Sequence, residues 1–145
     1  MRLLFIGDIV GRPGRDLVRA GLAALVEHHG VDLVIANGEN AAAGFGITRE
    51  IGEQLFEWGV DVLTSGNHIW DKKEALDYIG IEPRLLRPAN YPEGVPGNGS
   101  YLARTRSRPG RPTMSPMKRS RVTPEVHSSR SRWEWRGCGG HRAAG

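Results

Sequence analysis

The amino-acid sequence predicts an α/β domain built from parallel β-α-β units. Three observations lead to this fold class. Short apolar runs recur along the first hundred residues, and each ends in a glycine followed by polar residues. Segments of helical length with apolar residues at helical spacing separate these runs. Such a strand and helix alternation is typical of a parallel sheet with right-handed crossovers.

The first elements follow in order along the chain. "RLLFIGD" (2–8) is a strand, and 13–30 is an amphipathic helix that ends with Gly30 in the C′ position. "VDLVIANGEN" (31–40) is a nearly continuous apolar strand, as expected when both faces of a strand are buried. Thr48 is suited to cap a second helix over 49–59.

The remaining elements are a strand at 60–64, a helix over roughly 72–79 and a Pro/Gly loop over 87–100. Residues 101–103 are compatible with the start of another strand. Asp71 either caps the helix that begins at 72 or orients His68, and the pattern favours capping.

Charge and composition divide the chain into a domain over 1–103 and a basic tail over 104–145. Residues 1–104 carry 10 basic and 14 acidic residues, whereas residues 105–145 carry 10 and 2 and contain no Leu, Ile, Phe or Tyr. Such a tail cannot bury much apolar surface. Two interpretations stay open: a disordered tail, which would contact nucleic acid only through counterion release, and out-of-frame translation.

The single cysteine, Cys138, allows no intrachain disulfide, which fits a reducing cytoplasm. The apolar run at the N-terminus is too short for a signal-peptide core or a membrane span. We therefore expect a cytoplasmic protein with no membrane partner.

Polar side chains follow all three predicted strands, where the chain leaves the sheet. Because the carboxyl ends of parallel strands meet at one edge, these side chains should gather there. They belong to Asp8, Glu39, Asn40, Asn67 and His68. Singly, each has a structural explanation as a helix cap, a turn former or a loop histidine. Together they form an anionic cluster without Lys or Arg, which favours a bound cation, and the donor types suit Mn²⁺, Fe²⁺ or Zn²⁺ better than Mg²⁺.

Other phosphate-binding and nucleophilic motifs are absent from the sequence. "GDIVGRPG" is neither G-x-G-x-x-G nor a Walker loop, and no G-K-[ST] or G-x-S-x-G string occurs. A Rossmann-like nucleotide-binding domain and a serine or cysteine nucleophile therefore have little support.

The strings "FIGDIVGRPGR", "VIANGENAAAGFGIT", "GNHIWDKKE" and "LLRPANYPEG" resemble the calcineurin-like metallophosphoesterases. Within that superfamily they are similar to a bacterial subfamily that acts on 2′,3′-cyclic nucleotides, and the likeness covers about residues 1–103. The resemblance implies the N-terminal part of a four-layer α/β sandwich, two divalent metal ions and a metal-activated hydroxide that attacks phosphorus. Iron or manganese is the expected metal, with zinc or magnesium also compatible.

Carried over residue by residue, the resemblance implies that Asp8 binds the first metal and that Glu39 bridges both ions. Asn40 and Asn67 resemble the carboxamide ligands, and His68 resembles the proton donor to the leaving oxygen.

Three further residues are expected near the substrate. Arg12 and Arg15 open the first helix and could contact a phosphate, although surface solvation is the favoured explanation for both. Trp70 is expected to wall the pocket or stack on a base, and a place at the edge of the core is an equal alternative.

The resemblance also implies a difference in length. Family members are nearly twice as long, and their second half supplies three histidine ligands that this chain lacks. The expected function is metal-dependent hydrolysis of a phosphodiester or cyclic nucleotide, with the activity of this chain in doubt. The alternative is a non-catalytic fragment whose basic tail binds nucleic acid non-specifically, and a homo-oligomer is left open.

Overall fold

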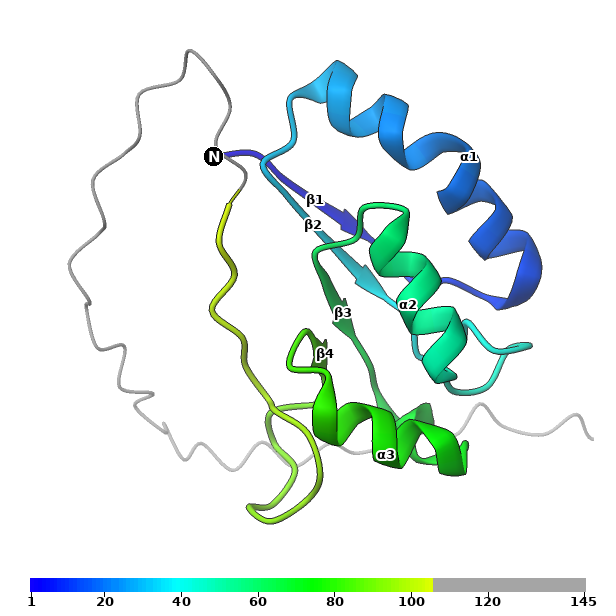
Figure 1. The fold of residues 1–145 in the computed structure, drawn as a ribbon, viewed down its shortest axis with the longest axis vertical. Coiled ribbons are helices and arrows are strands. Elements are labelled where there is room, and N and C mark those ends of the chain that lie inside the picture. Colours follow the sequence, from blue (N-terminus) through cyan, green and yellow to red (C-terminus); the bar gives the residue numbers. More distant parts are fainter. Residues whose placement is uncertain (106–145) are drawn as a thin grey trace, which may run out of the picture. The chain divides into compact units, whose positions relative to one another are not determined.

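The computed structural model describes residues 1–105, which form an α/β unit of four strands and three α-helices (Figure 1). In chain order the elements are β1 (Leu3–Ile6), α1 (Gly11–His29), β2 (Leu33–Asn37), α2 (Arg49–Glu57), β3 (Val62–Thr64), the 3₁₀ helix η1 (Asn67–Trp70), α3 (Lys73–Ile81) and β4 (Leu85–Leu86). The predicted fold class is confirmed.

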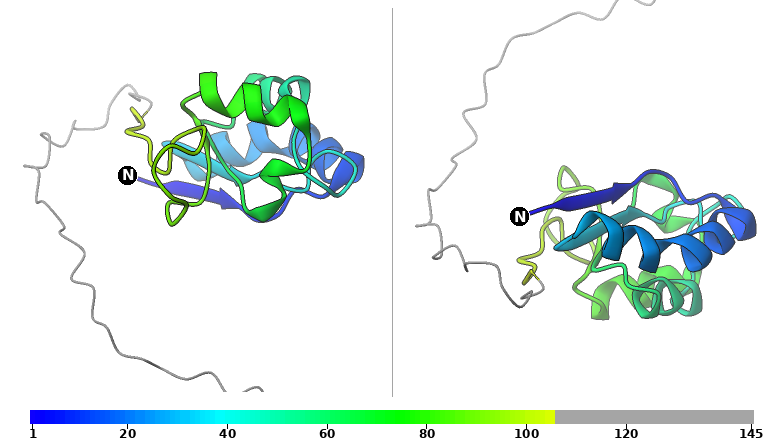
Figure 2. Two further views of the ribbon diagram at one scale, coloured as in Figure 1. Left: turned by 90° about the horizontal axis from the view of Figure 1, so that it is seen from below. Right: turned by 90° about the horizontal axis from the view of Figure 1, so that it is seen from above.

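The four strands form one parallel sheet in the order β1-β2-β3-β4. Each strand pairs with its successor, and each connection passes through a helix. Crossovers of one hand that always step in the same direction place their helices on the same side of the sheet. Figure 2 shows the three helices together on one face of the sheet.

The hydrophobic core lies between this face and the helices. Alternate strand residues point into it, as the two-residue period of a strand requires, so Leu63 and Leu85 are fully buried beside Leu22 of α1 and Leu55 of α2. On β1 the alternation leaves Leu3 and Phe5 on the opposite face, 49% and 56% exposed.

The prediction of a strand beginning at 101–103 is wrong. The fourth strand is Leu85–Leu86, and the backbone beside it is taken by Asn98, which forms an isolated bridge to Leu86. Leu102 is 91% exposed and pairs with no strand of the described residues. The helix boundaries differ less: α1 begins two residues before the predicted start, and Thr48 caps α2 by accepting a hydrogen bond from Ile51 N at 3.3 Å.

The predicted tail, apart from its first two residues, lies outside the described residues, so the domain boundary near 103 stays a prediction. No helix of residues 1–105 is long and apolar enough to cross a membrane.

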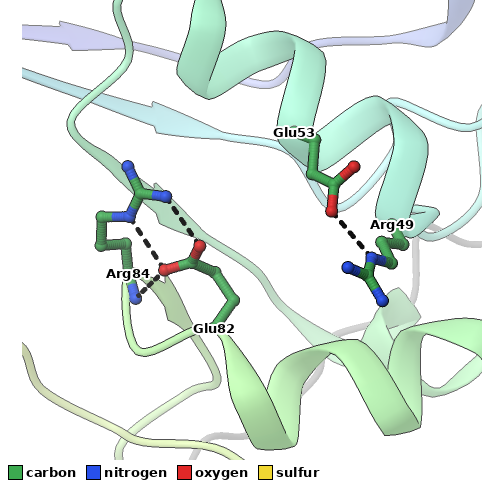
Figure 3. A network of polar contacts seen from close by, with 4 residues as sticks. All are labelled: Arg49, Glu53, Glu82 and Arg84. Carbon is green, nitrogen blue, oxygen red and sulfur yellow. Dashed lines mark hydrogen bonds and ion pairs between the residues drawn. The ribbon is translucent and has the colours of Figure 1, made fainter.

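Two ion pairs flank the contact between α2 and α3 (Figure 3). Arg49 contacts Glu53 within α2, and Arg84 contacts Glu82 just before β4, both at 2.7 Å. The hydrogen bonds from Arg84 hold the pKa of the Glu82 carboxyl below its usual value. Arg84 also stacks on the Phe56 ring beside a pocket of about 370 Å³ that contains none of the predicted site residues.

Tyr78 of α3 packs against Gly52 of α2, where a Cβ atom would lie 2.5 Å from the tyrosine ring. Its hydroxyl oxygen is buried and has no hydrogen-bond partner among the described residues. Burial, followed by the nearby Glu82 and Glu53 carboxylates, raises the pKa of Tyr78 to about 12.

We expect Tyr78→Phe to raise the free energy of unfolding by about 1 kcal/mol, because it removes a buried hydroxyl without a partner. The raised pKa favours the protonated tyrosine in the folded state. The contribution of Tyr78 to wild-type stability should therefore be constant below pH 10 and be lost between pH 10 and about 12, and the variant should lose less stability over that range. Denaturant titrations at several pH values measure both effects. Tyr101→Phe, at an exposed position, is the control, and a destabilised Tyr78→Phe would contradict the account.

Candidate metal centre

The carboxyl ends of β1, β2 and β3 meet at one edge of the sheet, and backbone hydrogen bonds join the loops that leave them. Ile9 N donates to Asn37 O, and Gly38 N donates to Thr64 O, both at 3.0 Å. These bonds connect the loop after β1 to the end of β2, and the loop after β2 to the end of β3. The edge predicted to collect the polar side chains therefore exists.

Asp8 and Asn40 contact each other at this edge. Asn40 Nδ2 donates to Asp8 Oδ2 at 2.8 Å, which joins the loops after β1 and β2 through their side chains. With its amide nitrogen so engaged, Asn40 turns its Oδ1 the other way. That oxygen is buried and has no hydrogen-bond partner in the described part of the chain.

Glu39 lies against the backbone of Gly66, next to Asn67. A Cβ atom at Gly66 would overlap Glu39 Oε2 outright and would lie 2.7 Å from Cδ, so only a glycine leaves room for the carboxylate. The turn that carries Glu39 is fixed by its own backbone N–H, which donates to Asn37 Oδ1 at 3.0 Å. Glu39 Oε2 is also buried, and within residues 1–105 it has no hydrogen-bond partner.

These two oxygens fit a hard divalent cation. A buried acceptor without a donor costs free energy, and the cost is larger for a charged oxygen. Carboxylate and carboxamide oxygens are ligands that such cations accept. Across the residues that the structure describes, no group of three His, Cys, Asp or Glu side chains is placed to hold a metal, so the fit depends on the carboxamides as well.

Asn67 and His68 form the first turn of η1, directly after Gly66. Asn67 is exposed, and His68 is half-buried. The His68 Nδ1 atom lies 2.7 Å from Asp71 Oδ2, and its ring meets the edge of the Phe45 ring at a centroid distance of 5.6 Å.

The preference for Asp71 as a helix cap is therefore wrong, and the alternative that it orients His68 is the one observed. The N-cap of α3 is Lys72, which makes no side-chain capping bond. The i to i+3 spacing along the 3₁₀ turn instead brings the Asp71 carboxylate next to the His68 imidazole.

The predicted substrate contacts have other partners in the structure. Arg15 Nη1 donates to the carbonyl of Ala41, and exposed Arg12 lies 3.6 Å from Asp16. Trp70 packs on the core and meets the Tyr91 ring edge-to-face at 5.4 Å. A role in substrate binding stays a prediction for all three.

Phe45 is the residue that the sequence reasoning missed. It is 59% exposed and lies beside His68, although 23 positions separate the two in the sequence. The available signal was an aromatic residue between two glycines in "AAAGFGIT", directly after the predicted ligands.

Comparison with known proteins identifies relatives of this chain. A 2′,3′-cyclic-nucleotide 2′-phosphodiesterase of Bacillus subtilis (strain 168) is 52% identical over 99 residues, which cover 68% of this chain and 38% of the relative. A putative phosphatase/phosphodiesterase of Mycoplasma genitalium is 32% identical over 106 residues, covering 70% and 38%. Among solved structures, a novel phosphatase of Mycoplasma pneumoniae matches with a TM-score of 0.63 and 36% identity over 67% of this chain and 36% of that one.

The model of the YmdB-like protein family matches residues 4–120, and the chain belongs to this family. A hypothetical protein of Thermus thermophilus has the same fold, with a TM-score of 0.63 and 47% identity over 68% of this chain and 38% of that one. The resemblance found in the sequence is confirmed. The chain spans less than two fifths of the length of these relatives.

Proposed function

We propose that this chain carries part of the site of a metal-dependent phosphodiesterase, whose substrates are phosphodiesters of the 2′,3′-cyclic nucleotide class. One observation carries the proposal: two buried oxygens without hydrogen-bond partners among residues 1–105, on Glu39 and Asn40, lie where three strand ends meet. The phosphodiesterase and phosphatase names of the relatives support the reaction type.

In this proposal the oxygens of Asp8, Glu39, Asn40 and Asn67 hold two divalent ions, iron or manganese foremost, with zinc or magnesium compatible. Glu39 is suited to bridge, since its two carboxylate oxygens can each serve one ion. Bound ions would supply a nucleophile at neutral pH and would offset charge on the phosphoryl oxygens. The hydrogen bond from Asn40 to Asp8 fixes the relative position of two of these ligands.

His68 is the proposed proton donor. Asp71 engages Nδ1, so Nε2 is the nitrogen left to deliver a proton to the leaving oxygen. The hydrogen bond fixes the direction of the ring, which a donor acting at one atom requires. The single cysteine supports a cytoplasmic setting for this chemistry.

Metal binding by the 145-residue chain tests the proposal. We expect weak Mn²⁺ binding, because residues 1–105 supply only four candidate ligands, and we expect phosphodiesterase activity near background. Asp8→Ala and Glu39→Ala should each weaken Mn²⁺ binding by about tenfold or more. Asp16→Ala, which removes an exposed carboxylate on α1, is the matched control and should change the affinity by less than about twofold.

Equilibrium dialysis measures the affinities, and assays with a 2′,3′-cyclic nucleotide and a generic phosphodiester measure the activity. Equal affinities in all four proteins would contradict the metal site. Robust turnover that disappears in Asp8→Ala would show that this chain completes its site, and the expectation of background activity would then be wrong.

A further inference from the structure

An apolar ring stands at the edge of the candidate metal centre. Phe45 is 59% exposed, and its ring meets the His68 imidazole at a centroid distance of 5.6 Å and an interplanar angle of 74°. Isolated exposed apolar residues are common on protein surfaces. Phe45 differs from them because it contacts the imidazole that the proposed reaction uses.

The loop that carries Phe45 is held in a defined conformation. Phe45 N donates to Ala42 O at 3.1 Å, and Ala42 N donates to Gly46 O at 2.9 Å. Ala43 has a φ of 57°, which costs a residue with a side chain free energy and persists only where the surroundings impose it. A hydrogen-bonded loop with this strain holds the backbone of Phe45 in a defined position.

The same loop packs on the backbone that carries His68. A Cβ atom at Gly46 would lie 2.9 Å from Lys72 Cγ and 3.1 Å from His68 O, so the glycine permits a close approach. The backbone of Phe45 is therefore fixed relative to that of His68, and a ligand can meet both rings without reordering the loop.

Trp70, for which the sequence left a pocket wall, a base contact and a place at the core edge open, packs on the core and against Tyr91. We propose that Phe45 is the base-stacking residue of the site and that it selects phosphate esters of nucleosides over esters without an aromatic group. The inference rests on the proposed function for the position of the phosphate.

The chemistry of a nucleoside phosphate connects the two groups. In the proposed reaction the leaving oxygen is a ribose oxygen that receives its proton from His68, and the base is attached to the same ribose. The base is therefore only a few covalent bonds from the leaving oxygen that faces the imidazole, and Phe45 contacts this imidazole. Stacking on a phenyl ring accepts every base, because each has a π-face, so the selection is for a base and not for its identity.

Binding to the full 145-residue chain in the presence of Mg²⁺ tests the inference without catalysis. The probes are adenosine 3′-phosphate, glycerol 3-phosphate and adenosine, each titrated while amide and imidazole NMR signals are followed. We expect adenosine 3′-phosphate to bind about 5- to 100-fold more tightly than glycerol 3-phosphate. Phe45→Ala should remove that preference, and Phe45→Tyr should keep it. Leu17→Ala, at an exposed apolar position on α1, should leave it unchanged.

The outcomes separate the inference from the proposed function. If Phe45→Ala keeps the preference, or if the wild-type chain binds the two phosphates equally, the stacking role is overturned. Binding of glycerol 3-phosphate that requires Mg²⁺ and is lost in Asp8→Ala would still support the phosphate site. If neither phosphate binds but adenosine shifts the signals of the Phe45 loop in wild type and not in Phe45→Ala, the stacking role stands and the proposed function fails. No response to adenosine or to either phosphate overturns both.

Discussion

Gly66→Ala is expected to weaken Mn²⁺ binding at the strand ends by about tenfold or more, although residue 66 offers no side chain to a metal. The added methyl group would overlap Glu39 Oε2 and would lie 2.7 and 2.9 Å from Cδ and Oε1. The Glu39 carboxylate must then move away from the edge of the sheet where the other candidate ligands lie. The Gly66 φ of −138° lies outside the left-handed region, so the expected effect comes from this overlap.

A double-mutant cycle with Glu39 makes the prediction specific. If Gly66→Ala acts through the carboxylate, it should have little further effect on Mn²⁺ affinity in a Glu39→Ala background. Gly80→Ala is the matched control, because that glycine lies on the exposed side of α3 and a Cβ atom there meets nothing within 4 Å. The control should bind Mn²⁺ as the wild type does and gain up to about 1 kcal/mol in free energy of unfolding. Additive losses from Gly66→Ala and Glu39→Ala would show that the overlap is not the cause.

The sequence was sufficient for the fold because its main elements are long or strongly patterned. Residues 31–36 are apolar except for Asp32, and Thr48 marks the start of α2. β4 was missed because Leu85–Leu86 is too short to show a period. The start of α1 was predicted at residue 13, whereas the helix begins at Gly11 and holds Pro13 within its first turn, where a proline is tolerated.

For the candidate site, the sequence predicted only those features that follow from the order of the strands. That Asp8, Glu39 and Asn67 share an edge follows from parallel topology and needs no coordinates. The contact of Asp71 with His68 was not the favoured prediction, because it is made by the 3₁₀ turn η1, which the sequence pattern does not predict. The position of Phe45 depended on a loop whose path is fixed by packing on a residue distant in the sequence. Side-chain contacts that depend on tertiary packing could not be predicted from this single sequence.

The face of the sheet opposite the helices is expected to drive self-association of this chain. Within the described residues β1 is an edge strand, and the exposed Leu3 and Phe5 pair with Leu33 and Ile35 of β2 on that face. An apolar edge strand with free backbone groups tends to pair with other chains.

Phe5→Glu should therefore raise the apparent dissociation constant for self-association by at least about tenfold. A second chain that covers Phe5 would gain on the order of 1.5–3 kcal/mol from its burial, and a carboxylate in its place would have to be desolvated. The fold should tolerate the change, because Phe5 is already 56% exposed. Sedimentation velocity over a range of protein concentrations measures the shift.

Leu17→Glu is the matched control. Leu17 is 76% exposed on α1, on the helical side of the sheet, so the substitution should leave self-association unchanged. A wild-type chain that stays monomeric at the highest concentration, or an equal response to the two substitutions, would show that this face of the sheet does not mediate self-association.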